Sequence, residues 1–322
     1  MPSFTEWMNR QQILLYLVSI AAGSALGIAL PSLCDQLGFL ITPFLGLLLY
    51  ITFLSMPLTK ALQGLKDLRF IFALMVTNFI AVPALVFALS RLLVAGQAVL
   101  IGVALVLLAP CVDYVIVFSG LAGGANQKLL AATPLLLVVQ MMLIPVYMYF
   151  IAGKSPMEIF SPEPFIEALI LLILIPLALA WSTQVFAKKH SVIRYVSHSA
   201  ELCMVPAMMG TLFCVVGSQI HSVSTHFEAL VGAAILFGAF VPLAAFFAYI
   251  VGRSYRLPAP ALRALAFSGV TRNSLVVLPI ALALPPEFSL ASSVVVTQTL
   301  VELLAMLVMI KAIPILIKST ST

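Results

Sequence analysis

Two opposite charges stand inside apolar stretches of this sequence, where charge is costly. Asp113 lies in LVLLAPCVDYVIVFSGLAGG, and Arg272 lies in ALAFSGVTRNSLVVLPIALAL. A charged side chain at the centre of a bilayer costs about 2.5–3.5 kcal/mol on insertion scales, so such residues usually serve a substrate or ion path. The two charges therefore mark a candidate path through a membrane.

Each charge has helix-breaking or polar neighbours. Pro110 lies three residues before Asp113, and a proline inside a helix removes one hydrogen bond and clashes with the preceding turn. The polar run 268–274 around Arg272 is of a kind that lipid does not tolerate. Broken helices at corresponding places in two halves of a transporter are typical of its binding site. The residues that we expect to contact the substrate are Pro110, Cys111, Asp113, Thr271, Arg272, Asn273, Ser274 and Glu302.

The charges suggest a pairing hypothesis. If the two broken segments cross, Asp113 and Arg272 could form a buried ion pair; otherwise Arg272 reaches a surface or lines the path alone. Glu302, in TQTLVELLAML, could couple ions or could hold a polar contact with residues 297–299. Four further polar residues are candidates for ion coupling or for lining the same path: Asn78, Ser119, Thr133 and Gln140.

The composition is that of an integral membrane protein. Of 322 residues, 63% are hydrophobic and 8% are charged, whereas a soluble domain carries about 25% charged residues. The net charge of +5 comes from basic residues scattered between apolar runs, which is typical of membrane loops and not of a nucleic-acid binder. The four cysteines show no zinc or disulfide spacing. We therefore expect a lipid bilayer as partner, no nucleic acid, no metal and no cofactor.

Apolar runs long enough to cross a membrane recur along the whole chain. A spanning helix needs about 20 mostly apolar residues. That window predicts ten spans, at 13–33, 40–58, 68–92, 98–121, 129–152, 164–187, 198–220, 227–251, 259–284 and 288–316. Residues 110 and 113 then fall in the fourth span, and residue 272 falls in the ninth.

The distribution of lysine and arginine predicts the orientation. With ten spans and a cytoplasmic N-terminus, thirteen basic residues face the cytoplasm, two face the other side and Arg272 lies within a span. Because basic residues concentrate in cytoplasmic loops, both termini are predicted to be cytoplasmic. We expect a multi-pass protein of the plasma membrane, which is the inner membrane of a two-membrane cell.

Matches at a constant offset predict that the chain contains two copies of one repeat. Asp113 and Arg272 are 159 residues apart, and at the same offset VPALVF, from Val82, matches VPLAAF, from Val241. Five spans per copy is an odd number, so the second copy enters the membrane inverted, as in secondary transporters. The predicted organisation is a first repeat at 1–153 and a second at 164–322. The predicted fold class is an all-α membrane protein of ten helices.

Three segments resemble the arsenite efflux permeases. The run LAPCVDYVIVFSGLAGG is similar to their fourth-helix signature, with Ala109, Pro110 and Cys111 as its Ala-Pro-Cys triplet. The run FSGVTRNSLVVLPIALAL is similar to their ninth-helix segment, and LVE at 300–302 resembles their tenth-helix motif. These permeases share a ten-helix fold with the bile acid/sodium symporters, built of two inverted repeats that form a panel domain and a core domain. In that fold helices four and nine are broken and cross.

The resemblance also implies roles for individual residues. Cys111 would be the thiol that binds the metalloid, because a thiolate is the soft ligand that arsenite prefers, and Glu302 would be the acid of the tenth helix. The sequence departs from the family at Leu275, where an acid is expected, and at Arg272, where an asparagine is expected. The residues that hold sodium in the sodium-coupled branch have no evident counterparts here. Protons, through Asp113, are therefore a better-supported coupling ion than Na⁺.

Two transport functions follow from these observations. The first is efflux of a metalloid oxyacid or a small anion, as in the arsenite permeases. The alternative is transport of an organic anion coupled to sodium or protons on the same scaffold. An intramembrane enzyme is not expected, because the chain contains neither HExxH nor a second catalytic acid in a Gly-rich setting. A sensor or a passive channel remains an alternative function. A monomer and a homodimer remain alternative oligomeric states.

Overall fold

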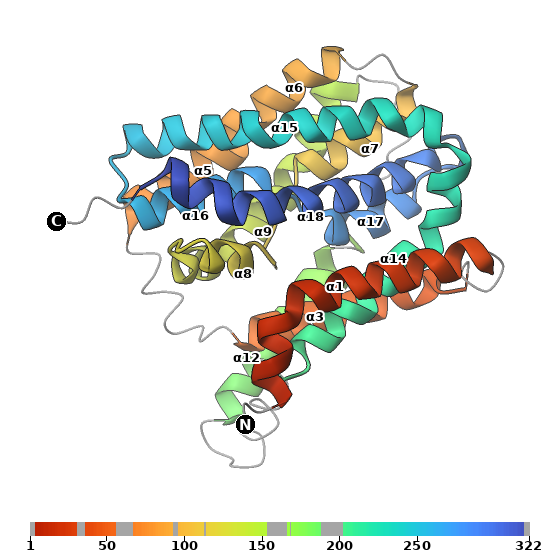
Figure 1. Cartoon of the computed structure of the whole chain (residues 1–322), viewed down its shortest axis with the longest axis horizontal. Helices are drawn as coiled ribbons and strands as arrows, with labels where there is room; N and C mark the ends of the chain where they lie inside the picture. Colours follow the sequence, from red (N-terminus) through yellow and green to blue (C-terminus); the bar gives the residue numbers. More distant parts are fainter. Residues whose placement is uncertain are drawn as a thin grey trace. The chain divides into compact units, whose positions relative to one another are not determined.

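The described part of the chain is helical. The computed structural model describes residues 4–30, 36–55, 67–92, 96–112, 114–152, 166–167, 169–187 and 202–318. Within these ranges the named elements are all helices (Figure 1), and the prediction of an all-α membrane protein is confirmed at this level. Asp113 lies outside the described residues.

Among the described residues, seven helices are long and apolar enough to cross a membrane. They are Gln11–Ala29, Leu68–Leu92, Asn126–Ile151, Ile170–Ala187, Met204–Thr225, Phe227–Ser254 and Pro286–Leu316. Three shorter helices are also apolar, at Gly38–Leu54, Gln97–Leu107 and Ala259–Val270. The chain is a multi-pass membrane protein. The last two short helices end at the breaks that the sequence predicts in spans four and nine.

The chain divides into two compact units, each made of two separate stretches. Unit 1 comprises Met1–Pro57 and Glu163–His226, and unit 2 comprises Leu58–Pro162 and Phe227–Thr322. Each unit therefore combines segments from both predicted repeats. The repeats themselves, at 1–153 and 164–322, stay a prediction.

Unit 1 is a helical bundle in which two helices approach closely. Its described elements are α1 (Phe4–Ala29), α3 (Gly38–Ser55), η2 (Leu169–Leu174), α12 (Ile175–Ala187) and α14 (Met204–Thr225). Helix α1 packs along α14, while α3 packs against both α14 and α12 (Figure 1). Gly23 and Gly27 lie on the buried face of α1. A Cβ added at Gly23 would stand 2.8 Å from the main-chain oxygen of Phe213 on α14, so the two backbones touch there.

Unit 2 contains the broken helices. Its described elements are α5 (Leu68–Val76), η1 (Thr77–Ala81), α6 (Val82–Leu92), α7 (Gln97–Leu107), α8 (Tyr114–Leu121), α9 (Asn126–Ala152), α15 (Phe227–Ser254), α16 (Ala259–Val270), α17 (Ser274–Leu282), η3 (Pro286–Phe288) and α18 (Leu290–Leu316). Helix α18 packs against α7, α15 and α17, and α15 packs against α16 (Figure 1). Helices α16 and α18 also contact α8, so the C-terminal third of the chain packs against both α7 and α8.

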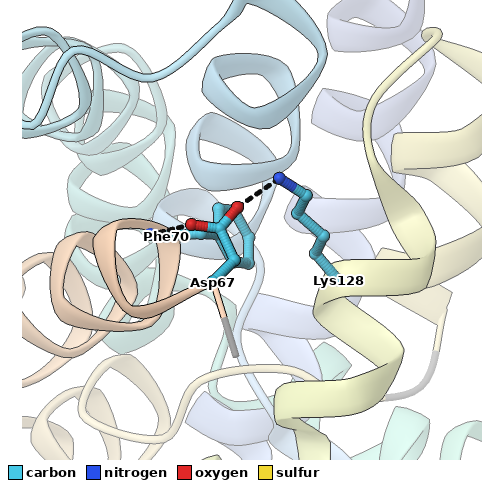
Figure 2. Close-up of polar contacts among 3 residues, drawn as sticks. All are labelled: Asp67, Phe70 and Lys128. Atoms are coloured by element: carbon cyan, nitrogen blue, oxygen red, sulfur yellow. Dashed lines mark hydrogen bonds and ion pairs between the residues drawn. The ribbon is translucent and has the colours of Figure 1, made fainter. Parts of the chain in front are cut away.

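An ion pair joins the starts of two helices in unit 2. Asp67 is the N-cap of α5, where its Oδ1 accepts a hydrogen bond from the backbone N–H of Phe70 at 3.2 Å. The Nζ of Lys128, in the first turn of α9, pairs with Oδ2 of the same carboxylate (Figure 2). The hydrogen bond from Lys128 is the main reason why the pKa of Asp67 lies below its ordinary value of 3.8.

Asp67→Asn is expected to remove the charge and keep the cap, because an asparagine oxygen can also accept from Phe70. The pair is partly exposed, so we expect the free energy of unfolding to fall by less than about 1 kcal/mol. This difference should disappear at high salt. Because the folded-state pKa is the lower one, the stability from this carboxylate is complete above 3.8 and is lost as pH falls through the folded value. Melting temperatures of wild type and variant, measured across pH and salt, should converge in acid and in high salt. A constant difference would contradict this account.

Candidate functional site

The first break separates α7 from α8. Helix α7 ends at Leu107, and α8 begins at Tyr114. Pro110 explains the break, because it has no N–H to donate and it disfavours helical geometry at Ala109 before it. Cys111 follows Pro110, and its side chain is buried. The break therefore leaves main-chain groups such as the oxygen of Ala109 and the N–H of Cys111 available to partners outside their own helix.

The second break separates α16 from α17. Helix α16 ends at Val270, where Thr271 turns to an extended conformation (φ −73°, ψ 134°). Asn273 starts α17 as its N-cap, and its Oδ1 accepts a hydrogen bond from the backbone N–H of Val276 at 3.2 Å. The polar run 268–274 thus supplies a C-terminal turn, an extended link and a cap. All three parts are buried.

The two breaks pair with each other through the main chain. The N–H of Cys111 donates to the oxygen of Thr271 at 3.1 Å, and the N–H of Asn273 donates to the oxygen of Ala109 at 2.7 Å. Pro110 and Arg272 thereby form an isolated antiparallel bridge. Backbone groups freed by a helix break must find partners at membrane depth. Here each break supplies the partners for the other.

Glu302 of α18 binds at the place where the two breaks pair, residues 109–111 and 271–273, which is called the crossing below. One carboxylate oxygen, Oε1, accepts from the hydroxyl of Tyr114 at 2.7 Å. The other, Oε2, accepts from the backbone N–H of Arg272 at 2.8 Å and from the side-chain amide of Gln298. The carboxylate is buried, and it receives donors from α8, from the second break and from its own helix. Of the two roles that the sequence leaves open for Glu302, polar contact with residue 298 is present.

The guanidinium of Arg272 is fully buried beside the crossing. Its Nη1 donates to the main-chain oxygen of Leu107 at 3.3 Å. Its Nη2 donates to Oδ1 of Asn78 at 3.0 Å and to the main-chain oxygen of Ser268. Its central carbon lies 5.7 Å from the centre of the Phe240 ring, within the range of a cation–π contact. All three hydrogen-bonded oxygens are neutral, and Arg272 is not drawn out to a surface.

Asn78 is held in place to receive Arg272. It lies in η1, a π-helical turn between α5 and α6; such turns often occur at functional sites. Its Nδ2 donates to the oxygen of Leu74 at 3.1 Å and to Oγ of Ser268 at 3.0 Å. With both donors used in this way, Oδ1 is left facing the guanidinium. Asn78, which the sequence suggests for ion coupling or for lining the path, thus lies against Arg272, and its functional role stays a prediction.

Most of the predicted contact residues meet at the crossing. Residues 110, 111 and 271–274 belong to the paired breaks, and Ser274 receives a hydrogen bond from Thr299 of α18 at 2.8 Å. Three other predicted residues are buried without a hydrogen bond in this cluster. Ser119 lies beside Gly124, Thr133 donates to Leu129 of its own helix, and Gln140 has no hydrogen-bond partner among the described residues. Their roles stay predictions.

Several residues of the cluster carry no separate signal in the sequence. Phe240 belongs to an apolar run and the main-chain oxygen of Leu107 to a helix end, whereas Gln298 belongs to the polar segment 297–299 that the sequence offers as a contact of Glu302. Ser268 belongs to the polar run around Arg272, and its place there was its only signal. Tyr114 directly follows Asp113, so a search for hydrogen-bonding groups next to the charge would have found it.

Comparison with known families gives one match. Residues 42–226 match the model of the Sodium Bile acid symporter family, which is more than half of the chain. The matched segment includes Asn78 and the first break, while Arg272 and Glu302 lie beyond it. A search of curated proteins found no match.

Proposed function

The chain belongs to the Sodium Bile acid symporter family, and from this premise we propose that it is a secondary transporter that exports a metalloid oxyacid or a small anion. The family and the apolar helices make it a membrane transporter of this superfamily. The finer proposal is supported by one observation, the crossing of two broken helices with Cys111 inside it. Interrupted helices at matching places of two halves are the usual position of a transport site.

Cys111 supports the metalloid part of the proposal. Its thiol is buried next to Pro110, and its N–H is fixed by Thr271 on the opposite segment. A thiolate is the soft ligand that binds trivalent arsenic, so a thiol at the crossing gives such a substrate a specific contact. The resemblance of the Ala-Pro-Cys triplet to the arsenite permeases points to the same residue.

Resistance of cells that lack their own metalloid efflux tests this role. Expression of the wild-type chain should raise resistance to arsenite, and Cys111→Ser should abolish the gain. Cys214→Ser is the matched control, because Cys214 is an equally buried thiol on α14 in unit 1. Resistance that survives the loss of Cys111 would exclude the thiol mechanism.

A second candidate is transport of an organic anion, and the buried charge of Arg272 favours it. A guanidinium at the crossing suits an anion better than it suits neutral arsenous acid. Flux in proteoliposomes against a panel of oxyanions, carboxylates and bile acids decides between the two substrates. Imposing sodium and pH gradients separately in the same assay identifies the coupling ion, for which we propose H⁺.

We also propose that Asp113 and Arg272 form an ion pair. The support is chemical: opposite charges flank the two paired breaks, and Nε of Arg272 has no hydrogen-bond partner among the residues that the structure describes. Glu302 accepts a hydrogen bond only from the backbone N–H of Arg272, and the oxygens bonded to the guanidinium are neutral, so a carboxylate at Nε would lower the cost of burying this charge.

A double-mutant cycle tests this pair. Asp113→Asn and Arg272→Gln each leave one charge without its partner, and so each is expected to lower the yield and melting temperature of the folded protein. Because the double variant removes both charges, it should be more stable than the worse single variant. A double variant that is no better than the worse single one would contradict the pair.

The remaining proposals concern architecture. We propose ten spans, in which α7 with α8 and α16 with α17 each make one broken span, and two inverted repeats. Unit 1 would be the panel domain and unit 2 the core domain, since each draws on both halves of the chain. The basic residues support cytoplasmic termini and a plasma or inner membrane location. The partners proposed are a small-molecule substrate and the bilayer, with no cofactor, no enzymatic activity, and a monomeric or homodimeric state.

A further inference from the structure

Two of the oxygens around the Arg272 guanidinium are carbonyls at helix ends. Leu107 is the last residue of α7, and Ser268 lies in the last turn of α16. The last four carbonyls of a helix have no donor within that helix. The C-terminal end also carries a partial negative charge, equivalent to about half an elementary charge. The two helix ends therefore favour a positive charge at this place, whatever molecule supplies it.

A dissolved cation is the ligand that such helix ends take in other transporters. Unwound carbonyls and the C-terminal ends of half-helices coordinate Na⁺ or H⁺ near the middle of the membrane. Asn78 adds an amide oxygen whose orientation is set, because its Nδ2 donates to Leu74 and to Ser268. Carbonyl oxygens are the ligands that hard cations prefer. The ring of Phe240 adds an electron-rich face on the α15 side.

We propose that the guanidinium of Arg272 is a tethered cation that fills a monovalent-cation site made by Leu107, Ser268 and Asn78. Because the tethered charge cannot leave, this site works without Na⁺ or another dissolved cation. Its binding also costs none of the translational freedom that a free ion loses. The inference deepens the proposed transport function, but its first test is a binding measurement that does not depend on that function.

The first test removes the tether and supplies the cation in solution. Arg272→Ala, purified in detergent, is melted in choline chloride and then with Na⁺, Li⁺, K⁺ or free guanidinium at millimolar concentration and constant ionic strength. The variant should melt below wild type. At least one of the cations should raise its melting temperature in a saturable way, because a ligand that binds only the folded state stabilises it by mass action. Wild type should show no such response, since its site is already filled.

Three variants make the outcome specific. Arg272→Lys keeps a tethered charge, so its melting temperature should not depend on the added cation. Arg91→Ala removes an exposed arginine that stacks on Phe87, and it should respond to cations as wild type does. Arg272→Gln keeps most of the side-chain volume without the charge, and it replaces the alanine variant if that variant does not fold.

The competing explanation is that Arg272 only holds the C-terminal ends of α7 and α16 together through its hydrogen bonds. In that case neither neutral variant regains stability with any small cation, and the proposal is overturned. A saturable response of wild type equal to that of the variants would overturn it as well. In proteoliposomes, flux through Arg272→Ala should recover with the same cation that restores its stability. If wild type itself shows no flux with any substrate tested, the proposed transport function is contradicted. The binding result does not depend on that outcome.

Discussion

Glu302→Ala is expected to lower the stability of the folded protein by about 3 kcal/mol or more. The carboxylate accepts hydrogen bonds from Tyr114, from the backbone N–H of Arg272 and from Gln298, and all three donors are buried. A buried donor left without a partner costs about 1–3 kcal/mol. The substitution also removes a negative charge next to a buried guanidinium, which makes that positive charge more costly.

Thermal melting of the purified protein measures this effect. Glu287→Ala is the matched control, because it removes an exposed glutamate in the turn that precedes α18, and it should change the melting temperature little. Glu302→Gln should fall between the two, since its amide keeps one acceptor oxygen and replaces the other with a donor. If Glu302→Ala and Glu287→Ala melt together, the carboxylate does not hold the crossing. Substrate flux should fall in the same order as stability.

Gly27→Ala is expected to push α1 away from α14 in unit 1. We expect the free energy of unfolding to fall by about 3 kcal/mol, the upper end of the range for overpacking. A Cβ at this position would stand 2.4 Å from the main-chain oxygen of Gly217 and 2.4 Å from Cγ2 of Ile220. The first of these atoms is backbone, so it cannot move without shifting α14. Gly23 makes the same kind of approach one turn earlier, and small residues at this spacing let membrane helices pack backbone to backbone.

Gly46→Ala is a matched control for this prediction. Gly46 lies inside α3 of the same unit, and a Cβ there would have no atom within 4 Å. The same substitution should therefore be neutral or stabilising, by up to about 1 kcal/mol of helix propensity. Melting temperatures of the two purified variants should move in opposite directions or differ by several degrees. Equal melting temperatures would show that the close approach of α1 to α14 does not matter for stability.

Much of the fold could be predicted because the signals are local. A long apolar run can only be satisfied by a helix in lipid, since its backbone groups must bond within the segment. A proline acts on its own turn, so Pro110 locates the first break without knowledge of the rest of the chain. The polar run around Arg272 locates the second break in the same way. The membrane class, the helical fold and both interruptions follow from such short-range chemistry.

The partners of the polar groups could not be predicted in this way. Glu302 is 188 residues from Tyr114, and Arg272 is 194 residues from Asn78. Nothing in either local pattern says which oxygen faces which donor, because that depends on how α18, α16 and η1 pack. The same holds for Gly23 and Gly27, whose importance appears only when α14 lies against them.

By itself the sequence determined that this protein is a helical membrane protein with two breaks in its helices and with charges inside apolar runs, because lipid and proline act on neighbouring residues. The tertiary structure decided that the breaks pair with each other, that Glu302 fastens them, and that Arg272 is held by carbonyls at two helix ends. The physical reason is that a freed backbone group or a buried charge accepts any suitable partner. Only packing selects which partner comes within reach.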